Sequence, residues 1–247
     1  MKKIVYITFG CLLFFAGCDD FLTEDVKTFA TPKELMLTKS GIEQCVNGIY
    51  IPGYALYSSR YFLGMFSLST DESLPEYEAA TTYAEIYDYV HNSANQCVYT
   101  FWEANVKGIT NANMVLDNLP ELGTLNIADE KQFLDYKKGE ALFLRALYYY
   151  QQVMAFGSVP LITDFNLLEL YPEKALVKDV FAQVILDLQE AEGLLPNWKA
   201  AIAEAGRPSR GAAKSLLAIV YMARAGSEVA ESTDFQEAAE KLKEVVD

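Results

Sequence analysis

The chain has 247 residues, of which 51% are hydrophobic and 13% aromatic, and its formal net charge is −14. This length suits one large domain or two small ones, and the hydrophobic fraction can build a sizeable core. So acidic a chain is a poor match for nucleic acid or for ligands held through anionic phosphates, both of which need a basic surface.

The N-terminus has the form of a targeting signal. Residues 1–3 are a basic n-region, and residues 4–15 are an apolar segment too short to span a bilayer. Small residues then precede Cys18, as in a lipobox, which predicts removal of residues 1–17 and acylation of Cys18. Two or three acyl chains there would anchor the protein stably in a membrane. The alternative is an ordinary signal peptide with an incidental cysteine.

Residues 18–39 are predicted to be a polar, irregular, lipidated tether, and residues 40–247 a helical domain. Asp19 and Asp20 follow the predicted acylation site at once, as in a surface-export signal or simply in a solvated linker. An amphipathic helix is predicted from Ser40-Gly41, with a stop at Pro52-Gly53. Residues 54–70 are predicted to be a loop leading into a helix.

Residues 70–97 are predicted to form a long loop rich in tyrosine. Tyrosine together with asparagine and aspartate can stack on a sugar and hydrogen-bond its hydroxyls. Tyr83 and Tyr87 are therefore candidate ligand-binding residues. The alternative is that these tyrosines pin an irregular loop onto the helices.

A further helix is predicted to start at Phe101 and to end at Pro120. Trp102 and Asn105 lie one helical turn apart, so an aromatic ring and an amide could meet one ligand. Both are candidate ligand-binding residues. The alternative for Trp102 is a buried packing residue at the start of the helix.

The most distinctive element is a helix predicted over residues 130 to 156, apolar nearly all round and therefore surrounded by other helices. Asp129 and Gln132 approximate a capping box at its start, while Gly157 and Pro160 mark its end. Arg145 needs an acidic or carbonyl partner in such surroundings, and we interpret it as a structural residue rather than a site residue.

The C-terminal third is predicted to contain an extended connection and three more helices. The connection covers residues 157–178, and the helices cover 180–195, 210–225 and a segment from about residue 235. The helix at 130–156 can be laid over the helix at 210–225, with small residues at matching places, and each is followed by an alanine-rich helix. This degenerate repeat is typical of tetratricopeptide-like hairpins.

Two cysteines, Cys45 and Cys97, remain in the predicted mature chain. An oxidising compartment would permit a disulfide between them, but sequence does not establish their proximity, and free buried thiols are equally compatible.

No catalytic signature is present. The chain has one histidine, and it lacks Cys-x-x-Cys, a phosphate-binding glycine loop and His-Glu-x-x-His. Asp71 and Glu72 are adjacent, whereas a glycosidase needs two carboxyls that face each other across the scissile bond. We predict that the protein is not an enzyme and uses no cofactor or metal.

Three ordered motifs resemble the SusD/RagB family of outer-membrane nutrient-binding lipoproteins. They are Glu140–Tyr150 with Phe156–Leu161, then Val180–Ala191, then Gly206–Ala218. The resemblance implies an all-α fold of tetratricopeptide-like helical hairpins with long irregular loops. It also implies a lipid-anchored protein at the cell surface that captures a glycan above a SusC-like TonB-dependent transporter, and it favours Asp71 as a ligand-facing residue. One departure is Val106, which stands where the family usually has an aromatic.

Members of that family are considerably longer than this chain. The apolar pattern that begins at Phe235 is still running when the sequence stops at Asp247, which suggests an N-terminal fragment or a truncated product. The leading hypothesis is glycan capture for import. The alternatives are a scaffold that binds only protein partners, and capture of peptide rather than glycan.

Overall fold

The described part of the chain is helical. The computed structural model describes residues 31–75, 81–165, 170–197 and 206–246, where the only β-type pairing is an isolated bridge between Pro160 and Lys174. The all-α prediction is confirmed. The helices are α3 (Pro32–Leu35), α4 (Lys39–Tyr57), α5 (Arg60–Ser67), α6 (Thr81–Tyr87), α7 (Gln96–Asn118), α8 (Glu130–Phe156), α9 (Val177–Leu194), α11 (Arg210–Ala225) and α12 (Asp234–Val246).

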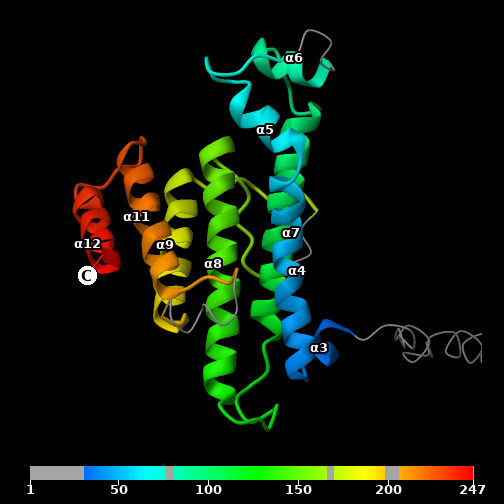
Figure 1. The fold of residues 1–247 in the computed structure, drawn as a ribbon, viewed down its shortest axis with the longest axis vertical. Coiled ribbons are helices and arrows are strands. Elements are labelled where there is room, and N and C mark those ends of the chain that lie inside the picture. The colour runs from blue at the N-terminus through cyan, green and yellow to red at the C-terminus, as the bar shows by residue number, and fades with distance from the viewer. Residues whose placement is uncertain (1–30, 76–80, 166–169, 198–205, 247) are drawn as a thin grey trace, which may run out of the picture.

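The long helices form a row in which each packs on the next. Figure 1 shows α4 and α7 side by side, followed by α8, α9, α11 and α12, with α5 and α6 at one end of the α4–α7 pair. The hairpins α8–α9 and α11–α12 stack through α9 and α11, which is the predicted repeat. None of the described helices is both long and apolar enough to cross a membrane.

Small residues allow these helices to approach closely. Ala141, Ala191, Ala213 and Ala218 are all completely buried between them. A side chain on Gly139 of α8 would meet Leu194 and Leu195 at the end of α9. Several of the small positions that suggested the repeat therefore lie at its helix–helix contacts.

Helix α8 has the predicted bounds but begins differently from the prediction. Asp129 takes a left-handed conformation, with φ of 56°, and its side chain makes no capping bond, so the predicted capping box is wrong. The Glu130 carboxylate instead fixes the preceding loop, because it accepts hydrogen bonds from the Gly123 and Leu125 amides at 3.1 and 2.9 Å. At the other end Gly157, with φ of 68°, donates to Val153 as expected of a C-terminal glycine.

The predicted stop at Pro52-Gly53 is wrong, because α4 continues through both residues to Tyr57. Proline leaves the carbonyl four residues earlier without its helical donor. Here that carbonyl, on Gly48, accepts instead from Asn111 Nδ2 of α7 at 2.9 Å. At the next residue, the Tyr148 hydroxyl donates to the Ile49 carbonyl at 2.7 Å, and it also accepts from the Gly53 amide at 3.1 Å. Side chains of α7 and α8 thus supply what the interrupted helix lacks.

Two other segments that were predicted to be irregular contain short helices. The tether prediction for 18–39 fails at Pro32–Leu35, where Thr31 and Glu34 form a capping box. The predicted loop over 70–97 contains α6, and α7 starts at Gln96 rather than Phe101 because Asn95 caps it. The predicted helix within 54–70 is confirmed as α5. The predicted signal peptide, Cys18 and most of the predicted tether lie outside the described residues.

A buried polar cluster joins α4, α8 and the segment before α11. Glu140 is completely buried and contacts Lys137 at 3.2 Å, Arg207, and the hydroxyl of Tyr50. Burial raises the pKa of Tyr50, and the neighbouring Glu140 raises it further. Arg207 also donates to Asn47 of α4 at 2.9 Å, so the chain entering α11 is held against the first long helix.

Cys45 and Cys97 are free buried thiols, 7% and 0% exposed. The sequence left open whether these two cysteines form a disulfide or stay free, and in the structure they are free. Burial raises the pKa of both thiols, which keeps them protonated and poorly reactive.

We predict that the protein loses stability at alkaline pH because two of its tyrosines are buried. Burial raises the pKa of Tyr148 and of Tyr149 to about 12, above the value near 10 of an unfolded tyrosine. The unfolded chain therefore releases protons first, and stability that is intact below about pH 10 falls as pH rises toward 12. We expect a loss of a few kcal/mol across this window. Urea unfolding at a series of pH values measures it, and a flat profile from pH 10 to 12 would contradict the assignment.

Candidate functional site

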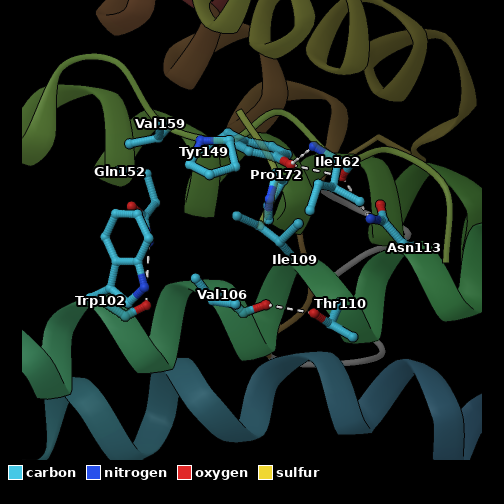
Figure 2. Close-up of a pocket in the computed structure, with 11 residues that line it drawn as sticks. Trp102, Val106, Ile109, Thr110, Asn113, Tyr149, Gln152, Val159, Ile162 and Pro172 are labelled. Carbon is cyan, nitrogen blue, oxygen red and sulfur yellow. Dashed lines mark hydrogen bonds between the residues drawn. The ribbon is translucent and has the colours of Figure 1, made fainter. Parts of the chain in front are cut away.

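A cavity of about 260 Å³ lies between α7, α8 and the segment that follows α8. Figure 2 shows its lining, with α7 below, α8 and the following segment above, and Trp102 at one end. None of the lining residues carries a charge. They are Trp102, Val106, Ile109, Thr110, Asn113, Tyr149, Gln152, Val159, Pro160, Ile162 and Pro172.

One face of α7 forms the floor of the cavity. Its five lining residues recur at the spacing of a single helical face, from Trp102 to Asn113. The Trp102 ring packs edge-on against Phe156 at the end of α8, with centroids 5.0 Å apart and an interplanar angle of 78°. Val106 is 39% exposed, so this face reaches the surface.

The opposite wall of the cavity is held in place through hydrogen bonds to the backbone amide and carbonyl of Ile162. The Tyr149 hydroxyl accepts from the Ile162 amide at 2.8 Å and donates to the Ile162 carbonyl at 2.7 Å. Asn113 Nδ2 donates to the same carbonyl at 2.8 Å. The segment pairs further on, where the Ala175 amide donates to the Val159 carbonyl at 2.9 Å. An irregular segment is thus fixed in place by α7 and α8.

Arg145 stabilises this arrangement through hydrogen bonds to Asp187 and Asn113. Its Nε and Nη2 donate to the two carboxylate oxygens of Asp187 in α9 at 2.8 and 2.7 Å, and its Nη1 donates to Asn113 Oδ1 at 3.0 Å. Asp187 is 2% exposed and Arg145 is 7% exposed. The interpretation of Arg145 as a structural residue with an acidic partner is confirmed, and through Asn113 it also orients one wall of the cavity.

The polar atoms that line the cavity differ in how far they are satisfied. The Thr110 hydroxyl donates to the Val106 carbonyl at 3.0 Å, and Asn113 is paired at both ends of its amide. Gln152 Nε2 donates to the Trp102 carbonyl at 3.3 Å. Gln152 Oε1 has no partner although it is buried.

Of the five predicted ligand-binding residues, the structure brings Trp102 to this cavity. Asn105 is completely buried, donates to the Phe101 carbonyl at 2.8 Å and does not line the cavity. The expected meeting of Trp102 and Asn105 at one ligand is therefore absent from this structure. Three residues along an α-helix fall short of a full turn, and here that offset leaves the Asn105 amide in the packing between helices.

The other three predicted residues lie at the α5–α6 end of the molecule. Asp71 is exposed in the turn after α5. Tyr83 of α6 stacks on Tyr61 of α5, with centroids 6.3 Å apart, and Tyr87 is 37% exposed. None of the three lines the cavity. The stacking of Tyr83 matches the alternative in which tyrosines pin this region onto the helices.

Sequence reasoning missed several residues of the cavity, above all Gln152, Asn113 and Tyr149. A signal for Gln152 was present, since an amide within a helix that is apolar nearly all round needs a reason to be there. No sequence pattern could place the wall of Val159, Pro160 and Ile162 over α7, because that contact depends on tertiary hydrogen bonds. Among the described residues, no group of His, Cys, Asp or Glu could hold a metal ion.

Comparison with known proteins agrees with this architecture. A family of SusD-like proteins described as starch-binding and associating with the outer membrane matches residues 21–222. The chain belongs to the SusD-like family. SusD-like carbohydrate-binding proteins are not catalytic, in agreement with the prediction that this chain is not an enzyme.

Individual SusD-like relatives align with most or all of this chain but with less than half of their own length. A SusD-like protein of Formosa agariphila is 27% identical over 252 aligned positions, which cover 100% of this chain and 46% of the relative. One from Bacteroides ovatus is 24% identical and covers 91% of this chain and 40% of the relative. The chain thus spans less than half the length of these relatives.

Solved SusD-like structures share the fold. A SusD superfamily protein of Parabacteroides distasonis superposes with a TM-score of 0.72 at 27% identity, over 84% of this chain and 44% of that one. A laminarin-binding SusD-like protein superposes with a TM-score of 0.67 at 25% identity, over 83% of this chain and 43% of that one.

Proposed function

We propose that this chain is a glycan-binding module of an outer-membrane uptake system and that the Trp102 cavity is where it contacts the sugar. The observation that supports this most is an uncharged cavity with an indole at one end, in a family described as starch-binding. Aromatic faces stack on the apolar faces of sugar rings, while nearby amides and hydroxyls take the sugar hydroxyls.

The proposed partner is a SusC-like TonB-dependent transporter, to which the module would pass oligosaccharide. This role rests on the family and on the outer-membrane association in the family's description. The helical row of α8, α9, α11 and α12 offers the extended surface on which stacked hairpins bind other proteins.

Anchoring through Cys18 is the second part of the proposal. Because stable attachment depends on acyl chains at that residue, we expect Cys18→Ala to leave the protein in the soluble fraction of producing cells. Fractionation after labelling with an alkyne analogue of palmitate measures both attachment and acylation. Retention of Cys18→Ala in the membrane with label still present would contradict the predicted site.

Calorimetric titration with a panel of oligosaccharides tests the function. The panel contains α-1,4-glucans, β-1,3-glucans of the laminarin type and alginate as an acidic glycan, with peptides of matched length in a separate arm. Binding of at least one glycan is the expected result. Tight binding to the transporter without binding to any glycan would favour a protein-binding scaffold, and binding confined to the peptide arm would favour peptide capture.

A further inference from the structure

Gln152 is the polar residue of the cavity whose hydrogen-bonding capacity is least used. It is 1% exposed, and its Oε1 atom has no hydrogen-bond partner. An amide oxygen buried without a donor costs about 1–3 kcal/mol, and such atoms are uncommon in folded proteins. A bound molecule could therefore supply the hydrogen-bond donor that this oxygen lacks.

The orientation of the amide follows from its neighbour. The Trp102 carbonyl can only accept, so the group beside it must be the Nε2 donor, at 3.3 Å, and Oε1 is left for another partner. That distance is beyond the usual range for an N–H···O bond. The amide is therefore held loosely enough to turn its oxygen toward a molecule that enters the cavity, and Figure 2 shows Gln152 extending toward Trp102 at this end.

The missing donor is best supplied by a neutral hydroxyl. No residue that lines the cavity is charged, and the chain carries a net charge of −14, so nothing there offsets the cost of desolvating an anionic sugar. A hydroxyl donates one hydrogen bond without bringing charge into the site. A uronate or sulfate group would bring further acceptors close to an oxygen that itself needs a donor.

The size of the cavity limits what enters it. About 260 Å³ is below the range of about 300–1,000 Å³ that holds a drug-sized ligand, so a single sugar unit fits better than a whole oligosaccharide. The remaining units would then lie outside, toward the surface that Val106 reaches.

From these observations we infer that Gln152 Oε1 accepts a hydrogen bond from one hydroxyl of a neutral sugar unit that stacks against Trp102. The inference rests on the proposed function and adds to it a ligand class, neutral glycans, and a residue that determines specificity. Gln152 thus recognises a hydroxyl, whereas Trp102 recognises the apolar face of the same unit.

Substitution by methionine separates this role from a structural one. Gln152→Met keeps the length of the side chain and removes the unpaired oxygen, so the unliganded variant should unfold at the same temperature as the wild type or higher. Its affinity for the tightest-binding neutral oligosaccharide of the panel should fall about tenfold. A purely structural glutamine would instead lower the melting temperature when replaced.

Gln151→Met is the matched control, because it makes the same change one position earlier on α8 at a residue that does not line the cavity. It should bind like the wild type. A series of the same oligosaccharide with single hydroxyls replaced by hydrogen completes the test. One deoxy position should weaken binding to the wild type about tenfold and leave binding to Gln152→Met unaffected.

Two results would overturn the inference while leaving the proposed function intact. One is equal affinity of Gln152→Met and wild type for a glycan whose binding Trp102→Ala weakens. The other is preference of the wild type for alginate over every neutral glycan. If the wild type binds no glycan of either kind, the proposed function fails and the inference fails with it.

Discussion

Replacing Arg145 by methionine is expected to lower the free energy of unfolding by about 3–5 kcal/mol, the usual cost of breaking a buried ion pair from one side. The substitution leaves Asp187, which is 2% exposed, with a hydrogen bond from Gln183 Nε2 at 2.7 Å in place of the ion pair. It also frees Asn113 from the guanidinium that orients it. Urea unfolding followed by circular dichroism measures the change.

The double variant Arg145→Met/Asp187→Leu is the control for this result. Removing both charges leaves no unpaired carboxylate, so most of the lost stability should return. A loss below about 1 kcal/mol in the single variant would mean that water or another group satisfies Asp187, and it would contradict the role of this pair as a buried brace.

Gly108→Ala is expected to lower the free energy of unfolding by about 1–3 kcal/mol, although alanine is the better helix former. A Cβ atom at this position of α7 would lie well inside van der Waals contact with the Tyr148 ring of α8. That ring cannot easily turn away, because its hydroxyl is bonded to both Ile49 and Gly53 of α4. The substitution should therefore separate the three helices at the point where they meet.

Gly48→Ala is the matched control, since it makes the same change inside α4, where a Cβ would meet nothing within 4 Å. There the helix propensity of alanine acts alone, and stability should rise by about 0.5–1 kcal/mol. Thermal unfolding of both variants shows whether each substitution raises or lowers stability. The close α7–α8 approach would be contradicted if Gly108→Ala stabilised the protein as Gly48→Ala does.

The elements that sequence placed best are those with strong local signals. The predicted helix at 130 to 156 coincides with α8, and the one at 210 to 225 coincides with α11, where Ser209 caps the start. Glycine stops and an acceptor at the N-cap act within a few residues, so they can be read from the chain. The repeat was also readable, because small residues at fixed spacing mark helix contacts.

The largest error occurred where distant residues replaced a local signal. Pro52-Gly53 is a strong local stop, and it fails because Asn111 and Tyr148, from other helices, satisfy the α4 backbone. The candidate site shows the same division. Trp102 could be identified from the sequence as an aromatic residue of a predicted helix. The cavity beside it depends on the Ile162 wall, which hydrogen bonds from α7 and α8 fix in place.

Calorimetric titration of Trp102→Ala with a neutral oligosaccharide that binds the wild type tests the central claim, that the Trp102 cavity holds the sugar. Loss of one aromatic contact should weaken binding by about 1–1.5 kcal/mol, roughly tenfold in affinity. Tyr87→Ala, at an exposed tyrosine outside the cavity, should bind like the wild type. Unchanged affinity in Trp102→Ala together with weakened binding in Tyr87→Ala would contradict the claim and move the site to the α5–α6 end.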